Sequence, residues 1–451
     1  MKSRTRMVSQ LPVDTGRSGW EAISQRHQPK VSLTENITAD WLIIGAGFAG
    51  LSAARRLSQL CPGDKIVVVD ACEVATGPAG RNSGFMIDVP HSLSTGEYAG
   101  SGADETLMEI RLNRHAISFA RSAAEEYGMS ALTFNPCGKI NASATENGLR
   151  HNRHYAESLS KIGEKFTRYD RQQIKEITGS DYFHDGLYTP GAVIIQPAQY
   201  IRDLAAGLQN NITLYEHSPV TELTQQGNCW RAKTPHGSVS APKVILGVNG
   251  HVEDFGFYRG RLMHIFTYAS MTRAYRDNSR FHSSSGAESW ALLPADPMGA
   301  TLRKLTCQNG DSRIVIRTRF TYDPGKTISS KRLQAVAAEQ RLSMDVRFPE
   351  LKQLPFEFSW AGRLCLSRNS VPAFGEVDHN LFSACCENGL GTVKSTLAGM
   401  MVAEMATGTR SELLGKYQHQ AAPKRLPPKP LAWCGINSYI HWQEHRAGAE
   451  R

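Results

Sequence analysis

Short apolar runs that end in glycine-rich turns recur along the chain. Residues 41–44 (WLII) and 66–69 (IVVV) are the first two, and similar runs occupy 212–216, 243–246 and 381–386. Strands buried on both faces of a parallel sheet have continuous apolar runs of this length. Between the first two runs, apolar and small residues recur at helical spacing over 51–57. This pattern predicts an α/β region in which buried strands alternate with helices.

A second pattern mixes polar and apolar positions. Residues 262–273 (LMHIFTYASMTR) alternate in part, and 290–293, 301–304 and 313–319 are further short runs. Partial alternation is typical of an antiparallel sheet with one wet face, so we expect a largely antiparallel sheet that forms a substrate pocket. Helical spacing also predicts helices over 103–127, 149–177 with an interruption at Gly163, 198–208, 333–344 and 392–405.

Composition and charge restrict the class of protein. The 451 residues are 41% hydrophobic and 21% charged, which is ordinary for a globular domain. No apolar run approaches a membrane span, and residues 1–7 lack the apolar stretch of a secretory signal, so we expect a cytoplasmic protein. Nine cysteines without C-x-x-C spacing favour reduced thiols over a disulfide framework or a metal site. The net charge of +9 would suit an anionic partner, but Lys and Arg are spread along the chain, so we do not expect nucleic acid.

The first apolar run leads into a Gly45-x-Gly47-x-x-Gly50 turn, and the second run ends at Asp70. Glycines on a strand-to-helix turn let the backbone approach a pyrophosphate, and the helix N-terminus stabilises its charge. An acid at the end of the second strand accepts a hydrogen bond from a ribose hydroxyl. The sequence therefore predicts a bound dinucleotide, with NAD and FAD both open at this point. The predicted contacts are Gly45, Gly47, Phe48, Ala49, Gly50, Asp70 and Ala71.

A second glycine-rich run, GPAGRNSG, occupies residues 77–84. It places several backbone N–H groups close together, as in a loop that wraps a phosphate or a polar ring edge. Together with the first motif, it resembles the D-amino-acid oxidase/glycine oxidase superfamily of FAD enzymes. It is most similar to the branch that contains gamma-glutamylputrescine oxidoreductase, in which a G-R-N-x-G run follows the second strand. The resemblance favours FAD over NAD, since NAD enzymes have no second glycine motif in this place.

The resemblance covers residues 40–406 and implies a fold class. We expect a Rossmann-like FAD-binding domain (α/β) interleaved with a substrate domain built on a largely antiparallel sheet (α+β). The FAD-binding domain would comprise 39–100, 185–255 and 355–420, and the substrate domain 101–184 and 256–354. Residues 1–38 would form an arm that packs over the body or is partly disordered, and 421–451 a tail that is extended at its prolines before a short segment around 440–444. The implied additional FAD contacts are Gly80, Arg81, Asn82, Ser83, Gly84, Val220 and Gly250.

A third glycine motif, Asn388-Gly389-Leu390-Gly391-Thr392, precedes a predicted helix. Reduced flavin holds negative charge near N1, and a helix N-terminus aimed at that edge stabilises it. Because first-turn N–H groups have no partner within a helix, all five residues are candidate flavin contacts. Lys394, in the same turn, is either a cation beside the flavin or a solvated lysine.

Few side chains are expected to act in the chemistry directly. Amine oxidation needs an amine oriented over flavin N5 more than an elaborate acid–base set. His264 and His91 are candidates for tuning substrate protonation, with a structural histidine as the alternative. Tyr268 lies four residues after His264, would share its strand face, and is a candidate substrate contact. Arg317 and Arg319 alternate on one strand, so either both face the flavin and bind the substrate or both face solvent.

These observations predict an FAD-dependent oxidoreductase that oxidises the C–N bond of a small amine or amino-acid derivative. Hydride transfer to flavin N5 would give an imine that water hydrolyses, and O2 or another acceptor would take the electrons. Three alternatives stay open: a dehydrogenase on the same scaffold that uses a quinone or protein acceptor, an FAD-containing nucleic-acid-modifying enzyme, and a binding protein that retains FAD without turnover. Cys365 lies in a segment where a relative bonds cysteine to flavin, but a buried free thiol is favoured.

Overall fold

The computed structural model describes residues 4–25, 28–90, 103–276, 287–307, 309–418 and 421–451. Its centre is a six-stranded sheet in the order β11-β4-β3-β15-β22-β21. All neighbours in this sheet are parallel except the edge strand β21, which is antiparallel to β22. The strands are β3 (Trp41–Ile44), β4 (Ile66–Val69), β11 (Ile212–Tyr215), β15 (Lys243–Leu246), β21 (Ala373–Asp378) and β22 (Leu381–Cys385).

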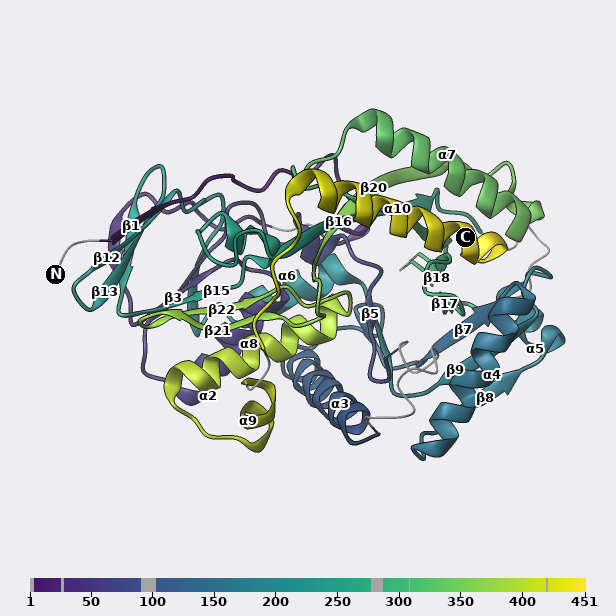
Figure 1. Ribbon diagram of the computed structural model, residues 1–451, viewed down its shortest axis with the longest axis horizontal. Coiled ribbons are helices and arrows are strands. Elements are labelled where there is room, and N and C mark those ends of the chain that lie inside the picture. Colours follow the sequence, from purple (N-terminus) through teal and green to yellow (C-terminus); the bar gives the residue numbers. More distant parts are fainter. Residues whose placement is uncertain (1–3, 26–27, 91–102, 277–286, 308, 419–420) are drawn as a thin grey trace.

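Helices cover one face of the parallel sheet. Alternate strand residues such as Ile43 and Val68 pack with the buried faces of these helices in one apolar cluster. In Figure 1 three of them, α2, α3 and α8, lie below the sheet. The alternation of buried strands and helices in the sequence thus produces the expected layer of helix on sheet. The helices are α2 (Phe48–Leu60), α3 (Ala103–Glu126), α6 (Pro197–Gly207) and α8 (Gly391–Thr407).

A five-stranded sheet covers the opposite face and includes the N-terminal arm. Its order is β1-β12-β13-β14-β2, and Leu223 and Trp230 pack from it against Leu42 and Val67. Trp20 of α1 (Gly19–Ile23) is fully buried. The described part of the arm therefore packs over the body. The strands are β1 (Arg4–Met7), β2 (Asn36–Thr38), β12 (Glu222–Gln226), β13 (Cys229–Lys233) and β14 (Ser238–Ala241).

An eight-stranded sheet, in the order β20-β16-β19-β18-β17-β7-β9-β8, forms the second half of the molecule. Its pairs are antiparallel except β17 with β7. The predicted substrate segments supply most of its strands, whereas β9 and β20 come from segments predicted to belong to the FAD-binding part. The strands are β7 (Lys139–Ser143), β8 (Thr167–Tyr169), β9 (Asp185–Thr189), β16 (Leu262–Thr272), β17 (Trp290–Pro294), β18 (Thr301–Thr306), β19 (Ser312–Tyr322) and β20 (Phe356–Ser367).

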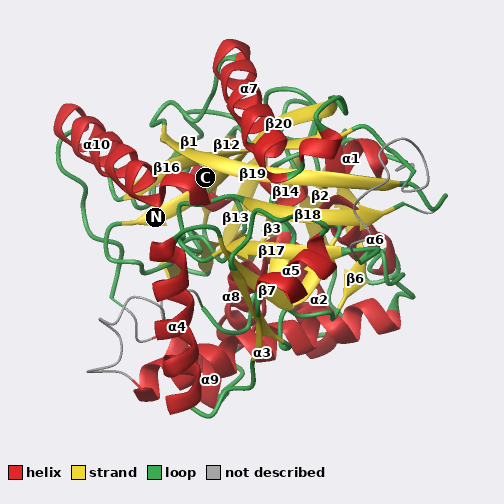
Figure 2. Ribbon diagram, turned by 90° about the vertical axis from the view of Figure 1, so that its right-hand side faces the viewer, coloured by secondary structure: helices red, strands yellow, loops and turns green. Residues whose placement is uncertain are grey.

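Two long helices lie on the outer side of this sheet. Helix α7 (Ser330–Arg347) packs on β16 and β19, where Gln340 Nε2 donates to the Tyr268 carbonyl at 2.9 Å. Figure 2 shows α7 and α10 (Lys429–Ala447) above the sheet and α3 and α4 (Glu146–Lys161) below it. The small sheet β5-β10-β6 connects the two halves, with strands β5 (Phe85–Met86), β6 (Phe134–Asn135) and β10 (Val193–Ile195).

The prediction of a mostly helical 149–177 is wrong in its middle. Helix α4 ends at Lys161, β8 follows, and α5 (Arg171–Thr178) begins after the capping residue Asp170. Strand β8 exists because it pairs with β9. The local spacing of apolar residues contains no information about such long-range strand pairing.

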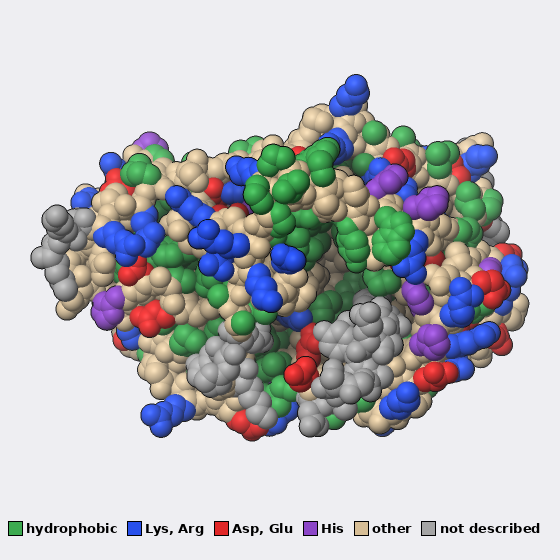
Figure 3. Space-filling model, viewed as in Figure 1, with side chains coloured by type: hydrophobic (Ala, Val, Ile, Leu, Met, Phe, Trp, Pro, Cys, Tyr) green, Lys and Arg blue, Asp and Glu red, His purple; other side chains and the backbone are tan. Residues whose placement is uncertain are grey.

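The prediction of a tail that is extended at its prolines is wrong after Pro428: residues 421–428 have no regular secondary structure, but a long helix follows. Helix α10 begins directly after Pro428, and Pro430 occupies its first turn, where no backbone N–H donor is required. Two of the four prolines that suggested an extended chain, Pro428 and Pro430, therefore start a helix. Apolar side chains gather over α10 in Figure 3, and the large exposed ones are Leu431, Trp433, Tyr439 and Trp442. Among the described helices, none has the length and apolar character needed to cross a membrane.

Candidate functional site

A cavity of about 1240 Å³ lies at the carboxyl edge of the parallel sheet. Residues that directly follow β3, β4 and β15 line it, namely Gly45, Asp70 and Gly247, and Cys386 lines it after β22. Residues of β16, β19 and β20 from the eight-stranded sheet line it as well. Ligands of open α/β sheets bind at this edge, so the topology places the glycine motifs around one cavity.

The first glycine motif forms a tight turn with exposed donors. Gly45 has φ +102°, and a Cβ on Gly50 would lie 1.8 Å from the Gly45 carbonyl oxygen. Helix α2 starts at Phe48, three residues before the predicted start, and its capping residue Gly47 offers no side-chain acceptor. The first-turn N–H groups are therefore available to an anion. The cavity is lined by Gly45, Gly47, Phe48 and Ala49. Gly50 does not line it but packs against the Gly45 carbonyl, where a side chain would not fit.

Asp70 is tied to the backbone of the same turn. Its Oδ2 accepts from Ala46 N at 2.7 Å, and its Oδ1 accepts from Cys72 N at 2.9 Å. Burial raises the pKa of Asp70, and the two backbone donors oppose that shift. Each carboxylate oxygen has a further lone pair, so the group can also accept from a ribose hydroxyl. Ala71 lines the cavity beside it.

The second glycine motif divides into lining and supporting residues. Asn82 and Ser83 line the cavity, but Gly80, Arg81 and Gly84 are not among its lining residues, in contrast to the predicted direct contacts. Arg81 is buried and donates to the Thr76 carbonyl at 2.6 Å, so its side chain fixes the turn instead. A Cβ on Gly80 would lie 1.8 Å from the Ala75 carbonyl oxygen, and Gly84 has φ +76°.

Two side chains from distant segments hold this motif, and the sequence analysis assigned neither of them a role. Trp20 Nε1 donates to the Asn82 carbonyl at 2.8 Å. Arg303 of β18 donates to the Ser83 carbonyl at 2.9 Å, and its guanidinium lies over the Trp20 ring, 4.7 Å from the centroid. Burial lowers the pKa of Arg303 to about 10. The one feature of the sequence that could have indicated this support is Trp20, a single tryptophan in a polar arm.

The third motif forms the N-terminus of α8 at the cavity wall. Asn388, Gly389, Leu390, Gly391 and Thr392 all line the cavity, as do Val220 and Gly250 from the predicted FAD contacts. Leu390 caps the helix without a side-chain acceptor, so the first-turn N–H groups are available.

Lys394 lines the cavity but is not a free cation. Its Nζ lies 2.8 Å from Glu109 Oε1 of α3. Both side chains are partly exposed, at 26% and 31%. The ion pair leaves less positive charge for a flavin edge than an unpaired lysine would supply.

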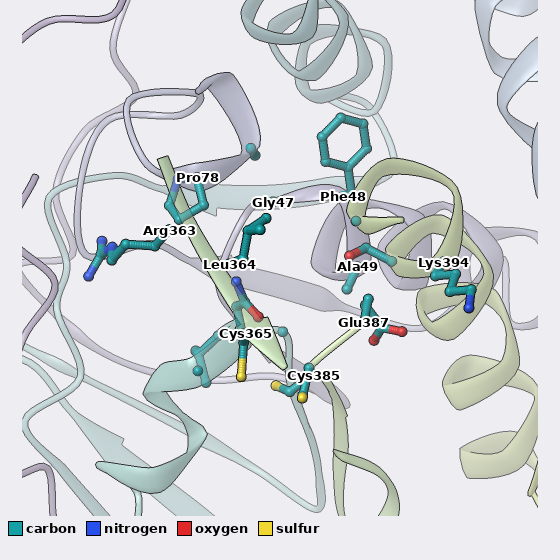
Figure 4. Close-up of a pocket in the computed structure, with 18 of the residues that line it drawn as sticks. Gly47, Phe48, Ala49, Pro78, Arg363, Leu364, Cys365, Cys385, Glu387 and Lys394 are labelled. Carbon is teal, nitrogen blue, oxygen red and sulfur yellow. The ribbon is translucent and has the colours of Figure 1, made fainter. Parts of the chain in front are cut away.

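Glu387 lies directly before this motif, and the sequence analysis did not single it out. Its side chain is buried, and within the described part of the chain its Oε1 has no hydrogen-bond partner. Its Oε2 accepts a long hydrogen bond of 3.5 Å from Tyr417. Burial raises the pKa of Glu387 to about 8, although the Lys394 charge lowers it. Figure 4 shows Glu387 and Lys394 next to each other at the α8 end of the cavity, with Arg363 at the opposite side. An acid between a buried strand and a glycine motif is the signal that could have identified it.

His264 lies in the cavity wall with its ring held in place. Its Nε2 lies 2.8 Å from Glu253 Oε2 of η3 (Asn249–Glu253), and its Nδ1 faces the Gly250 backbone closely enough that a Cβ there would lie at 2.7 Å. This environment is that of a structural histidine. The other histidine candidate, His91, lies outside the described residues.

Tyr268 does not share the cavity face, so the prediction of a substrate contact by this residue is wrong. It is buried under α7, and its hydroxyl lies 2.7 Å from Thr321 Oγ1. Along β16, Thr267 lines the cavity instead. Tyr268 packs with Phe266 and with Val336 of α7 in one apolar cluster.

Arg317 and Arg319 do not share a face, which corrects a second expectation. Residues Tyr268 and Thr267 pair with Thr318 and Phe320, so Arg319 is an extra residue in a β-bulge, with φ +63°. Arg317 and Phe320, on the two sides of the bulge, line the cavity. Arg319 points away from the cavity lining to Glu444 of α10, where Nη1 and Oε2 lie 2.7 Å apart.

Arg317 is a half-buried cation, and among the described residues no acid is paired with it. It lines the cavity, its Nη1 has no hydrogen-bond partner among the described residues, and burial lowers its pKa to about 10. Its guanidinium lies 5.2 Å from the Phe320 ring centroid. A buried guanidinium nitrogen without a partner is costly unless a ligand completes its hydrogen bond.

Three buried cysteines line one end of the cavity: Cys365, Cys385 and Cys386. Burial raises the pKa of Cys385 to about 12 and that of Cys365 well above its ordinary value. In Figure 4 the Cys365 and Cys385 sulfurs lie near each other. A neutral thiol is a poor nucleophile, so this environment favours free thiols.

The cavity fits a dinucleotide with a flavin ring. Two helix N-termini present uncapped N–H groups to it, those of α2 and α8, and Asp70 lines it beside the turn that leads into α2. A Cβ on Gly45 or on Gly50 would make contacts below 3 Å. Gly45, Gly47, Phe48, Ala49, Asp70, Ala71, Asn82, Ser83 and residues 388–392 would hold FAD.

Comparisons with known proteins agree with this site. Residues 40–405 match the family described as DAO, FAD dependent oxidoreductase. A probable oxidoreductase OrdL from Haemophilus influenzae is 25% identical over 393 residues, which cover 84% of this chain and 86% of that protein. Gamma-glutamylputrescine oxidoreductase from Escherichia coli is 24% identical over 408 residues, covering 87% and 89%.

Solved structures show the same fold. Glycine oxidase from Geobacillus kaustophilus superposes with a TM-score of 0.68 at 16% identity, over 87% of this chain and 100% of that one. L-Proline dehydrogenase from P. horikoshii superposes with a TM-score of 0.63 at 18% identity, over 85% and 97%. The comparisons confirm the superfamily, the fold class and the FAD cofactor that the glycine motifs predicted. They also confirm the predicted enzyme class, an amine or amino-acid oxidoreductase.

Proposed function

The chain belongs to the DAO family of FAD-dependent oxidoreductases, and from this premise we propose that it oxidises the C–N bond of a small amino acid or N-substituted amino acid. The product is an imine, which water hydrolyses. Bound FAD supplies the hydride acceptor, so the protein has to bind and orient the substrate more than it has to supply a reactive side chain.

The proposed substrate class is inferred from Arg317. It is a half-buried guanidinium in the cavity wall, its Nη1 has no hydrogen-bond partner among the described residues, and the bulge at Arg319 sends the neighbouring arginine elsewhere. Carboxylates bind to arginine through two parallel hydrogen bonds. A substrate carboxylate would complete the hydrogen bonds that Arg317 lacks, so the proposed substrate has a carboxylate near its reacting amine.

Acidic side chains from α3 support an amine at the other end of the substrate. Glu105 and Glu109 line the cavity, and Glu109 is paired with Lys394. Negative charge at a cavity attracts a cationic amine from solution. His264 is held by Glu253, so its role is to support the wall that carries Gly250.

Anaerobic mixing of the FAD-loaded protein with matched pairs of compounds tests the proposal. Each pair consists of an amino acid or N-alkylglycine and the same amine without its carboxylate. We expect the carboxylated member to bleach the flavin absorbance at least about tenfold faster, since a charge-assisted hydrogen bond contributes about 1.5–3 kcal/mol. Equal rates within every pair, or no bleaching by any compound, would contradict it.

Admitting air after bleaching then identifies the acceptor. Rapid return of the flavin colour means that O2 takes the electrons. Slow return that a quinone analogue accelerates means that the protein is a dehydrogenase on the same scaffold.

A further inference from the structure

The N-terminal arm contributes side chains to the cavity that no glycine motif predicts. The chain between β1 and α1 crosses the top of the molecule in Figure 1. Residues 8–14, here called the arm segment, have no regular secondary structure. Five of its seven residues line the cavity: Val8, Gln10, Leu11, Pro12 and Asp14.

One end of the arm segment is attached beside Val220, one of the predicted FAD contacts. Val8 N donates to the Thr221 carbonyl at 3.0 Å, and Thr221 directly follows Val220. Ser9 N and Ser9 Oγ donate to the Asp254 carbonyl at 3.2 Å and to Asp254 Oδ1 at 2.8 Å. The arm segment therefore begins at the same part of the wall as Val220 and the residues around Gly250.

The other end is attached by a buried ion pair. Asp14 Oδ2 accepts from Arg363 Nη2 of β20 at 2.8 Å, with side-chain exposures of only 12% and 7%. Arg363 Nη1 lies 2.6 Å from His251 Nε2, and His251 Nδ1 lies 2.8 Å from Asp254 Oδ2. This chain of polar contacts connects the two attachment points of the arm segment.

We propose that the arm segment is a wall of the FAD site that retains the bound cofactor. Leu11 supplies apolar contact to FAD, and the Asp14–Arg363 pair holds the segment against the cavity. Leu11 is 38% exposed and lines the cavity, so a bound cofactor would cover part of its side chain. Val13 is 60% exposed, does not line the cavity, and is the natural internal control on the same segment.

The test measures the rate at which FAD leaves the holoprotein after dilution, from the fluorescence of released flavin. Leu11→Ala removes apolar contact with FAD, and Asp14→Asn weakens the attachment. We expect both to release FAD about 5- to 30-fold faster than the wild type, and Val13→Ala to match the wild type. Unchanged rates in Leu11→Ala and Asp14→Asn, or equal acceleration by Val13→Ala, would overturn the proposal.

Thermal unfolding of each apoprotein separates this role from a folding defect. The proposal requires that Leu11→Ala apoprotein unfolds at the wild-type temperature while its holoprotein loses FAD faster. Faster release that is matched by an equal loss of apoprotein stability would assign Leu11 a structural role and overturn the proposal. Because the readout is flavin release, the result does not depend on which substrate the enzyme oxidises.

Discussion

Glu387→Gln should remove a strong pH dependence of stability. Burial raises the pKa of Glu387 from 4.5 to about 8. Between these pH values the folded protein holds a proton on this carboxyl and the unfolded chain does not. The free energy of unfolding therefore falls as pH rises, by about 1.4 kcal/mol per pH unit and by about 4–5 kcal/mol across the window. Glutamine keeps the shape of the protonated acid and does not titrate. The free energy of unfolding of the variant therefore lacks this pH-dependent contribution.

The assay is denaturant unfolding with saturating FAD at about pH 5 and about pH 8.5, converted to free energies of unfolding. At the lower pH, the wild type and Glu387→Gln should have similar stability. At the higher pH, the variant should be more stable by up to about 4–5 kcal/mol. Glu125→Gln, an exposed change on α3, is the control and should give the same difference at both pH values. A Glu387→Gln difference that does not change with pH would refute the reasoning.

Three further predictions concern the cofactor turn, the substrate pocket and the arm. Gly50→Ala should abolish FAD binding, measured by absorbance of the purified protein, because its Cβ would lie 1.8 Å from the Gly45 carbonyl oxygen; normal flavin content would contradict this. Arg317→Met should lower kcat/KM for a carboxylated substrate by about 10- to 150-fold and leave the matching amine unaffected, whereas equal losses for both would exclude carboxylate binding. Trp20→Ala should lower the free energy of unfolding by about 3–5 kcal/mol, since the ring is fully buried and its Nε1 donates to Asn82; a loss below about 1 kcal/mol would show that the arm is dispensable.

The cofactor half of the site could be predicted because its determinants are local. The strand, the glycine turn and the helix of residues 41–60 lie next to one another in sequence, and each leaves its own pattern. The same holds for β22, the turn at Asn388 and α8. Glycine spacing also marks positions where a side chain cannot fit.

The substrate half could not be predicted in the same way because long-range pairing decides it. Arg319 adopts φ +63° where β16 pairs across β19, and nothing local in an alternating strand indicates that one residue is extra. That bulge separates Arg317 from Arg319. The buried state of Glu387 and the Asp14–Arg363 pair likewise depend on segments far apart in sequence.

The absorbance spectrum of the purified protein before and after acid precipitation tests the central claim that this cavity binds FAD. We predict a flavin spectrum before precipitation and a yellow supernatant that contains FAD afterwards, since Cys365 is a buried thiol with a raised pKa. Colour that stays in the pellet would instead indicate a covalent bond and contradict the assignment of Cys365 as a free thiol. A protein without flavin that also fails to bind added FAD would contradict the whole account of the site.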